Sequence, residues 1–452
     1  MTVTVTVTVT VTVLRGRTPS PLPLPVPRVL SLPPLMTFSA LGLSDSLCRA
    51  TSDLGYTGPT PVQTQAIPAI LRGGDVWASA RTGSGKTAAF LLPLLDVLAA
   101  RPARPPRPLR ALVLVPTREL AVQIGEAIER LGRHLPAALV TRVAIGGVSI
   151  NPQLMALRGG ADVVVATPGR LLDLVEHNAL ALATVQTLVL DEADRLFSLG
   201  FADELARVLA LLPARRQNLL FSATLPAPVL ALSASILRAP TRIDIDSGQT
   251  PDAQSIVQRA ILVDEGKRTL LLRHLLETEK WSHVLVFVDS GHRADHVTTK
   301  LTRVGVTAAP LSGALSQGTR AKALADFKAQ KLRVLVATDV AARGLDIAQL
   351  PAVVNYDLPR SPTDYLHRIG RTGRAGESGV AVSFVTADSE AHFQLIQKRH
   401  RVRVPLERLA GFEPTDVATP TLDPHGGVKG KRKSKKDKLR EAATRGSGDP
   451  ES

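Results

Sequence analysis

Short apolar runs alternate with polar clusters along most of the chain, beginning near residue 60. Each run holds four to six residues rich in Val and Leu, and a polar cluster follows it. Runs of this length and composition are typical of strands that are buried on both faces of a sheet. In the first half the pairs are ALVLVP before TREL, DVVVA before TPGR, TLVL before DEAD, and NLLF before SAT.

The segments between these runs have helical apolar spacing, as in TRELAVQIGEAIERLGRHL (117–135). Alternation of strands and helices predicts a parallel sheet that is covered by helices. In such sheets ligands bind beyond the carboxyl ends of the strands, where the polar clusters fall.

The same pattern then repeats. HVLVFVDS, RVLVATD, AVVNYDLP and GVAVSFVT are again apolar runs with polar ends, and GTRAKALADFKAQ (318–330) is helical in spacing. Between the halves lies the polar, turn-rich DIDSGQTPDAQS (244–255), which is typical of a linker. We therefore predict two α/β domains of similar build. The predicted parts are an N-terminal extension (1–35), a first domain (36–245), a linker (246–255), a second domain (256–410) and a disordered basic tail (411–452).

Composition agrees with a two-domain globular protein, because 452 residues are too many for one ordinary core. The chain is 44% hydrophobic and has no apolar run of the length that a membrane span requires. Its one cysteine, Cys48, excludes an internal disulfide framework and any zinc site built on several cysteines. We interpret Cys48 as a small buried hydrophobic residue in a reducing compartment.

The net charge of +15 is unevenly distributed. KGKRKSKKDKLR (429–440) holds eight Lys or Arg residues against one Asp. A charge of this sign indicates an anionic partner, with nucleic acid first and an acidic membrane second. The alternative for the tail alone is a solvated appendage without a partner.

Residues 1–35 do not follow the pattern, since TVTVTVTVTVTV precedes a Pro-rich segment without acidic residues. This segment has three possible interpretations: an aggregation-prone strand, a transit peptide, and an artefact of start assignment with translation beginning at Met36. We favour the third. The intact mass of the natural protein would test it.

ARTGSGKT (80–87) follows the apolar-flanked DVWASA and precedes the amphipathic AAFLLPLLDVLAA. A strand, a Gly-rich turn and a helix N-terminus together form an anion cradle of backbone N–H groups. Lys86 is the only lysine before Lys267 in a chain that otherwise uses Arg. The compact ammonium of Lys can reach the β- and γ-phosphates of a nucleotide. The planar guanidinium of Arg is bulkier and directs its donors differently. Thr87 supplies a hydroxyl for Mg²⁺.

DEAD (191–194) ends another predicted strand. Phosphoryl transfer needs one carboxylate to hold Mg²⁺ and another to orient or deprotonate water. Asp191 suits the metal role and Glu192 suits the base. The alternative is a solvated acidic cap on the next helix.

HRIGRTGR (367–374) places Arg368, Arg371 and Arg374 among glycines in the second predicted domain. Arginines on such a turn can converge on one anion, and a γ-phosphate from the other domain is a candidate. The alternative is a basic surface that contacts nucleic-acid phosphates.

Taken together, these motifs resemble those of DEAD-box ATP-dependent RNA helicases of superfamily 2, and within them most closely the bacterial RhlE type. The resemblance covers about residues 36–410. It implies two tandem RecA-like domains, each a mostly parallel sheet covered by helices, with flexible N- and C-terminal extensions.

The resemblance also implies a role for each matching residue. Phe38 and GYTGPTPVQ (55–63) resemble the adenine-reading element, with Phe38 stacking on adenine and Gln63 bonding its edge. ATP contacts are implied for Ala80, Arg81, Thr82, Gly83, Ser84, Gly85, Lys86 and Thr87, with ribose contact by Asp346. RNA contacts are implied for Thr117, Arg118, Gly147, Thr167, Arg170, Arg320, Thr338 and Gly344. Ser222 and Thr224 would couple hydrolysis to strand separation, and Arg371 and Arg374 would be arginine fingers.

Three segments depart from the family pattern. Gly58 replaces a charged residue, LSGA (311–314) replaces a histidine-glycine element, and VFVDS (286–290) matches only loosely. None of them removes a catalytic group, so we expect local changes in RNA or domain contacts.

The expected function is RNA-stimulated hydrolysis of ATP with Mg²⁺, coupled to local, non-processive opening of RNA duplexes or remodelling of RNA–protein complexes. Aromatic residues are only 3% of the chain, so backbone contact with weak sequence preference is expected. The alternatives are an ATP-gated RNA clamp or assembly factor and a DNA-directed translocase. We expect a cytoplasmic monomer with ribosomal or RNA-decay protein partners and no membrane contact.

Overall fold

The computed structural model describes residues 36–80, 83–245, 256–342, 347, 350–373 and 379–416. The predicted extension 1–35, the linker 246–255 and the tail beyond residue 416 therefore lie outside the described residues. The described residues of the first predicted domain (36–245) are called the first lobe below, and the described residues within 256–416 are called the second lobe.

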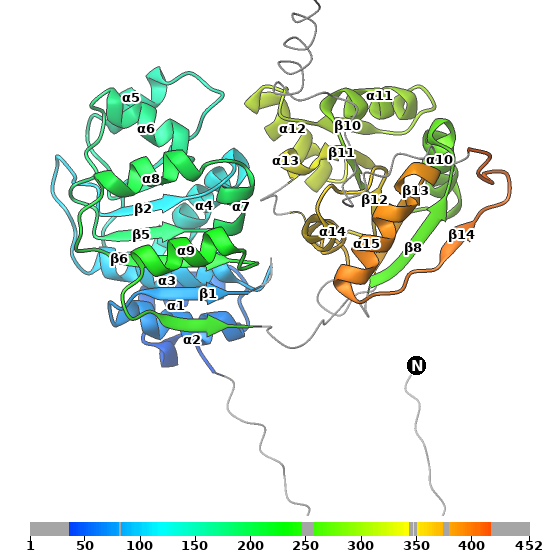
Figure 1. The fold of residues 1–452 in the computed structure, drawn as a ribbon. Helices are drawn as coiled ribbons and strands as arrows, with labels where there is room; N and C mark the ends of the chain where they lie inside the picture. The colour runs from blue at the N-terminus through cyan, green and yellow to red at the C-terminus, as the bar shows by residue number, and fades with distance from the viewer. Residues whose placement is uncertain are drawn as a thin grey trace, which may run out of the picture. The chain divides into compact units, whose positions relative to one another are not determined.

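The first lobe is built on a sheet of seven parallel strands within the described residues, in the order β3-β4-β2-β5-β6-β1-β7 (Figure 1). The central strands β2, β4 and β5 are buried at every position, as the continuous apolar runs predict. The strands are β1 (Val76–Ser79), β2 (Ala111–Leu114), β3 (Thr141–Ala144), β4 (Val163–Ala166), β5 (Thr187–Leu190), β6 (Gln217–Ser222) and β7 (Thr241–Asp244).

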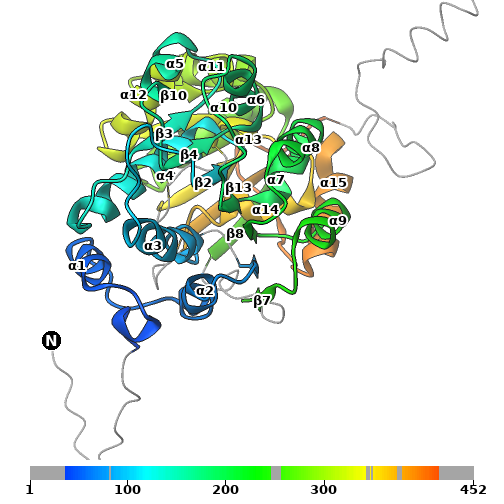
Figure 2. The ribbon, with the colours of Figure 1, turned by 90° about the vertical axis from the view of Figure 1, so that its left-hand side faces the viewer.

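Helices cover both faces of this sheet. One face packs against α1, α2, α3 and α4, and the other against α5 to α9, as the two hydrophobic clusters and Figure 2 show. The helices are α1 (Asp45–Asp53), α2 (Pro61–Leu71), α3 (Lys86–Ala99), α4 (Arg118–Leu131), α5 (Asn151–Leu157), α6 (Pro168–Glu176), α7 (Ala193–Ser198), α8 (Ala202–Leu211) and α9 (Ala227–Ile236), with the 3₁₀ turns η1 (Ser39–Leu41) and η2 (Gly132–His134).

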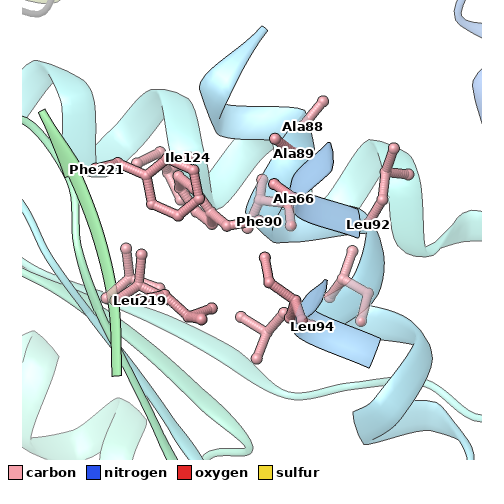
Figure 3. Packing of buried hydrophobic residues seen from close by; sticks show 14 of the residues in the cluster. Ala66, Ala88, Ala89, Phe90, Leu92, Leu94, Ile124, Leu219 and Phe221 are labelled. Atoms are coloured by element: carbon pink, nitrogen blue, oxygen red, sulfur yellow. The ribbon is translucent and has the colours of Figure 1, made fainter. Parts of the chain in front are cut away.

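The core of the first lobe lies directly behind the start of α3. Phe90 of α3 packs on Phe221 of β6 with ring centroids 5.2 Å apart, and Ile124, Ala66 and Leu219 close around them (Figure 3). All five side chains are fully buried. This packing fixes α3, and therefore the loop at its N-terminus, against the sheet.

The second lobe repeats the architecture with a seven-stranded parallel sheet within the described residues, in the order β10-β11-β9-β12-β13-β8-β14. Its helices α10 and α11 cover one face, and α12 to α15 cover the other. The strands are β8 (Ile256–Leu262), β9 (Val284–Val288), β10 (Ala308–Leu311), β11 (Val334–Thr338), β12 (Ala352–Asn355), β13 (Gly379–Val385) and β14 (Leu406–Arg408). The helices are α10 (Arg268–Thr278), α11 (Gly291–Thr302), α12 (Gln317–Lys328), α13 (Asp339–Ala342), α14 (Pro362–Ile369) and α15 (Glu390–His400), with the 3₁₀ turns η3 (Glu265–Lys267) and η4 (Ala387–Ser389).

Candidate nucleotide and RNA site

The strand order divides the carboxyl edge of the first sheet into two halves. The Gly-rich loop follows β1, SAT ends β6 and DEAD follows β5, and these three strands are consecutive in the sheet. The polar clusters PTREL, the glycine pair and TPGR follow β2, β3 and β4, which are also neighbours. The edge therefore has a half with phosphate chemistry and a half with the predicted RNA residues.

The phosphate loop has the backbone that an anion cradle needs. Gly83 and Gly85 have φ of 79° and 92°, in the left-handed region that suits glycine. α3 begins at Lys86, which is buried, and its Nζ donates a hydrogen bond to the carbonyl oxygen of Ala80. The ammonium thus folds back over the loop at the N-terminus of α3, where the helix dipole favours an anion.

Gln63 supports this loop from the side. Its Oε1 accepts a hydrogen bond from the Thr60 N–H (2.9 Å), and its Nε2 donates to the carbonyl oxygen of Gly85 (3.1 Å). A Cβ on Gly85 would lie 2.5 Å from Nε2, so only glycine fits there. Gln63 therefore ties α2 to the loop, while its predicted contact with adenine stays a prediction.

Phe38 lies just before η1 and is also buried, with its ring tilted 40° against that of Tyr56 at 6.1 Å. Phe38 belongs to the hydrophobic cluster that includes α2 and α3, whereas Tyr56 is exposed. The structure places Phe38 beside the adenine-reading segment, and its stacking on a base stays a prediction.

Asp191 follows β5 and is 3% exposed. Burial raises the pKa of Asp191 to about 7, with the Glu192 charge adding to the rise and Lys86 opposing it. A carboxylate whose pKa is raised in this way lacks sufficient positive charge nearby. Such a group is suited to binding a cation.

Glu192 occupies the left-handed region with φ of 51°, at the start of α7. Burial raises the pKa of Glu192, whereas Arg195, Arg371 and Lys86 lower it in part. Its Oε2 and the Oδ1 of Asp194 are buried atoms without a hydrogen-bond partner in the described structure. Because unpaired buried oxygens cost free energy, this spot is suited to a ligand that supplies donors or a metal.

The segment SAT is bonded to the last residue of DEAD. Thr224 Oγ1 donates to Asp194 Oδ2 (2.6 Å), and the Asp194 N–H donates to Ser222 Oγ (3.3 Å). Ser222 Oγ in turn donates to the Thr224 carbonyl oxygen (2.6 Å). The predicted coupling residues therefore contact the acidic cluster directly, through an aspartate that the sequence interpretation had not assigned.

Two arginines contact the glycine pair or the residue that follows it, on the RNA half of the edge. Arg118 of α4 lies so close to Gly147 that a Cβ there would be 1.9 Å from its Nη1. Arg170 of α6 donates from Nη2 to the Val148 carbonyl oxygen (2.9 Å), while its Nη1 is buried without a partner in the described structure. Guanidinium donors gathered in this way match what a phosphodiester backbone accepts.

Threonines occupy the N-cap positions of the two helices in this half, and the side chain of Thr117 makes a cap hydrogen bond. Thr117 precedes α4, and its Oγ1 accepts from the Leu120 N–H (3.3 Å). Thr167 precedes α6 and is bonded through its N–H to Ala144 of β3 (3.0 Å). Both positions put a hydroxyl at a helix N-terminus, where anions bind.

In the second lobe Arg368 is held internally. Its guanidinium donates to both Asp339 carboxylate oxygens (2.6 and 2.7 Å) and to the Asp357 carbonyl oxygen (2.6 Å), and it lies over the Phe287 ring at 4.9 Å. At 2% exposed, Arg368 therefore holds α14 against the segment after Thr338. Of the three arginines considered for one anion, Arg368 has a positioning role in this structure.

Arg371 and α14 reach the acidic cluster of the first lobe. Arg371 lowers the pKa of Glu192, and Arg195 Nη1 of α7 binds Asp364 Oδ1 of α14 at 2.6 Å. Both partners of this ion pair are largely buried. Groups from both lobes therefore act on the DEAD carboxylates.

A second ion pair joins the RNA elements. Arg320 Nε and Nη2 each lie 2.8 Å from Glu119 Oε1, with both side chains 5% exposed, and Nη1 donates to the Ser312 carbonyl oxygen (2.9 Å). We expected Arg320 to contact RNA. In this structure its guanidinium is buried against Glu119 of PTREL, and the RNA contact stays a prediction.

The remaining predicted residues are partly accessible. Thr87 is half-buried beside the loop, as are Ser84 and Thr338. The residues missed by sequence reasoning are Glu119, Asp194 and Arg195, all inside or beside motifs already recognised, so proximity to a motif was the available signal. Five predicted residues lie outside the described part of the chain: Arg81, Thr82, Gly344, Asp346 and Arg374.

The donor set fits Mg²⁺ held together with a nucleotide. Within the described ranges, no group of three or more His, Cys, Asp or Glu residues gathers to hold a metal alone. Mg²⁺ is usually bound by one or two carboxylates plus substrate phosphates, and the buried, cation-poor Asp191 with the Thr87 hydroxyl near the loop agrees with that pattern.

These features define a class of protein: a two-lobed RecA-like nucleotide hydrolase, in which one half of the first sheet's carboxyl edge carries the residues predicted to contact RNA. Residues 60–232 match the DEAD/DEAH box helicase domain, and residues 266–376 match the helicase conserved C-terminal domain. The chain is 42% identical over 354 residues to the ATP-dependent rRNA helicase RRP3 of Gibberella zeae, covering 78% of this chain and 72% of the relative. It is 39% identical over 364 residues to the DEAD-box ATP-dependent RNA helicase CshA of Bacillus cereus, covering 80% and 68%.

Solved structures agree. S. cerevisiae Dbp5 bound to RNA and ADP BeF3 aligns with a TM-score of 0.72 at 30% identity, covering 82% of this chain and 95% of that chain. Mss116 bound to ssRNA and UDP-BeF aligns with a TM-score of 0.75 at 26% identity, covering 84% and 81%. The chain belongs to the DEAD-box ATP-dependent RNA helicases, and the predicted fold of tandem RecA-like domains is confirmed. No helix among the described residues has the length and apolar character to cross a membrane.

Proposed function

We propose that this DEAD-box helicase couples RNA-stimulated ATP hydrolysis to local, non-processive opening of short RNA duplexes. The observation that carries the proposal is that two residues of the second lobe act at the DEAD motif: Arg371 lowers the pKa of Glu192, and Asp364 pairs with Arg195 of α7. Hydrolysis would then depend on how the lobes meet, and RNA bound across both lobes would favour the hydrolytic arrangement.

In the proposed mechanism Lys86 and the loop N–H groups bind the β- and γ-phosphates. Asp191 and Thr87 would hold Mg²⁺, which would supply neutralisation of phosphate charge. Glu192 orients the attacking water and takes its proton, for which a raised pKa is an advantage. Arg371 stabilises the charge on the transferring group. Arg374 has the same proposed role.

Opening of a duplex would follow from the RNA half of the edge. Arg118, Arg170 and the glycine pair would hold one strand by its backbone, in a path that the complementary strand cannot share. This event would be linked to the acidic cluster by two hydrogen bonds, one from Thr224 Oγ1 to Asp194 Oδ2 and one from the Asp194 N–H to Ser222 Oγ.

We further propose that the chain is of the RhlE type, acts as a cytoplasmic monomer and works with ribosomal or RNA-decay proteins. The relatives named as rRNA helicases support ribosomal RNA as the first natural substrate to test. Fractionation of cells and the sedimentation of the purified chain would test location and oligomeric state.

The deciding experiment is steady-state ATP hydrolysis by the full chain alone, with single-stranded RNA and with DNA of the same sequence. We expect strong stimulation by RNA and little by DNA, because 2′-hydroxyl contacts distinguish the two. Equal stimulation would favour a DNA-directed translocase. Stimulated hydrolysis without opening of a labelled duplex would favour an ATP-gated RNA clamp.

A further inference from the structure

The C-terminal end of α15 carries a cluster of cations that the helicase motifs do not use. Lys398, Arg399, Arg401 and Arg403 are all exposed, and we call them the basic corner. Their side chains make no hydrogen bond or ion pair with the described part of the chain. By contrast, most of the buried and half-buried arginines in the second lobe are paired, as Arg259 is with Glu407 and Glu279.

No acid that is close in sequence offsets this charge. The sequence has no Asp or Glu between Glu390 and Glu407. Glu390 lies at the opposite end of α15, about 15 Å away along the axis. Glu407 is already bound to Arg259 at 2.8 Å. The basic corner therefore presents a local positive field that is not neutralised within its own surface.

The backbone of the basic corner is held firmly, unlike a free tail. Arg401 ends α15 in the left-handed region with φ of 54°, and the Val404 N–H donates to Gln397 Oε1 at 2.7 Å. His400 lies 2.6 Å from the Pro362 carbonyl oxygen and stacks on Tyr365 of α14. Beyond the helix, Val402 and Val404 turn inward while Arg401 and Arg403 stay exposed.

We propose that the basic corner is a second RNA-binding surface, which holds the phosphodiester backbone of RNA that extends beyond the nucleotides bound by the helicase motifs. Exposed, unpaired guanidinium groups on a firmly held backbone are suited to contacts with phosphates, which position nucleic acid without reading its sequence. The proposal rests on RNA binding, which the family provides, and is independent of how duplexes are opened.

The test uses the full chain with three substitutions, Arg399→Gln, Arg401→Gln and Arg403→Gln. The matched control is Lys280→Gln, Lys300→Gln and Arg303→Gln, which removes the same charge from exposed positions on α11 and just beyond α10 and α11. Two RNAs are compared by fluorescence anisotropy across a salt series: a short single strand that fills only the motif contacts, and the same strand extended by further unpaired nucleotides.

We expect the corner variant to bind the short RNA like the control. For the extended RNA we expect roughly tenfold weaker binding at low salt, and a salt slope lower by about 2, from three lost phosphate contacts on a single strand. RNA-stimulated hydrolysis with saturating short RNA should be unchanged, which separates this surface from the proposed motor function.

Equal salt slopes for the corner and control variants on the extended RNA would overturn the proposal, and an acidic protein partner would then be the better explanation. Equal weakening on both RNAs would also overturn it, because the surface would then belong to the motif contacts. Unchanged thermal unfolding of both variants guards against loss of the fold, since all six positions are exposed.

Discussion

The carboxyl edges of the two sheets use charge in opposite ways. In the first lobe Glu192 Oε2 and Asp194 Oδ1 are buried without a partner in the described structure, and burial dominates the pKa of Asp191. In the second lobe both carboxylate oxygens of Asp339 accept hydrogen bonds from Arg368, at 2.6 and 2.7 Å. The first edge leaves buried carboxylate oxygens without hydrogen-bond donors, whereas the second provides a donor for each oxygen of Asp339.

This difference separates chemistry from positioning. A buried acid without a partner costs stability until a ligand or metal arrives, so its retention points to binding. A buried acid that is bound to arginine fixes the backbone around it but is not available to a ligand. The first edge is therefore suited to reaction, and the second to holding Arg371 in place.

The largest expected effect comes from removing the arginine that the second lobe directs at the first. Arg371→Lys should lower kcat by roughly 10³-fold or more, because a point charge cannot reproduce the guanidinium contact with a transferring phosphoryl group. Single-turnover hydrolysis would measure it. Arg360→Lys, at an exposed position before α14, is the control; an equal rate for both variants would contradict the finger assignment.

Removing the unpaired acid of the first edge comes next. Glu192→Gln should reduce hydrolysis by roughly 10²–10⁴-fold through loss of the base. It should not reduce thermal stability, since a buried charge without a full set of partners is replaced by a neutral group. Asp203→Asn on the exposed face of α8 serves as the control. A stable variant with normal hydrolysis would exclude Glu192 as the base.

The hydrogen-bonded pair of the second edge, Arg368 and Asp339, should affect stability instead. Arg368→Lys should destabilise the second lobe by about 3 kcal/mol, because Lys cannot reproduce the two-point contact of the buried guanidinium with the half-buried Asp339. Urea unfolding measures this change. Arg273→Lys, in an exposed ion pair with Glu277, should cost under about 1 kcal/mol. Comparable losses would remove the distinction between the two edges.

A smaller effect is expected at Thr224, which is predicted to couple ATP hydrolysis to duplex opening. Thr224→Val keeps the side-chain volume but removes the hydroxyl that donates to Asp194. We expect hydrolysis within a few-fold of normal and duplex opening reduced by roughly tenfold, equivalent to the loss of about one hydrogen bond to a charged group. Parallel ATPase and unwinding assays on the same preparation would decide. Equal losses in both would mean that Thr224 serves hydrolysis alone.

The smallest and most gradual effect concerns pH. The pKa of Asp191 is about 7 in the folded chain against 3.8 when unperturbed. The folded state thus keeps a proton that the unfolded state releases, so this stabilisation is full below about pH 4 and is lost as pH rises to about 7. Without nucleotide, the melting temperature should fall less between pH 5 and pH 8 in Asp191→Asn than in the unmodified chain. Identical pH profiles would contradict the raised pKa.

Much of the fold follows from local pattern. Continuous apolar runs such as ALVLVP and TLVL predict doubly buried strands because both faces of a parallel strand lie under helices. The phosphate loop is equally local, since its glycines, Lys86 and the start of α3 lie within a few residues of one another. The motif order then identifies the family, and most of the predicted site residues lie at the carboxyl edges of the sheets.

Strand order could not be predicted in this way. That β1, β6 and β5 are neighbours, so that the loop, SAT and DEAD meet, depends on long-range pairing that apolar runs of similar composition do not specify. The same holds for the partner of each charge. Arg368 and Arg371 lie three residues apart in one motif, yet one is bound to Asp339 and the other acts on Glu192.

The sequence by itself therefore determined which chemical groups this protein has, the order in which they occur and the layered fold that carries them, because these depend on short-range periodicity. Only the tertiary structure decided which polar groups are hydrogen-bonded within the chain and which are left for a ligand. Satisfaction depends on burial and on distances of a few ångströms between residues that are far apart along the chain, as Glu119 and Arg320 are.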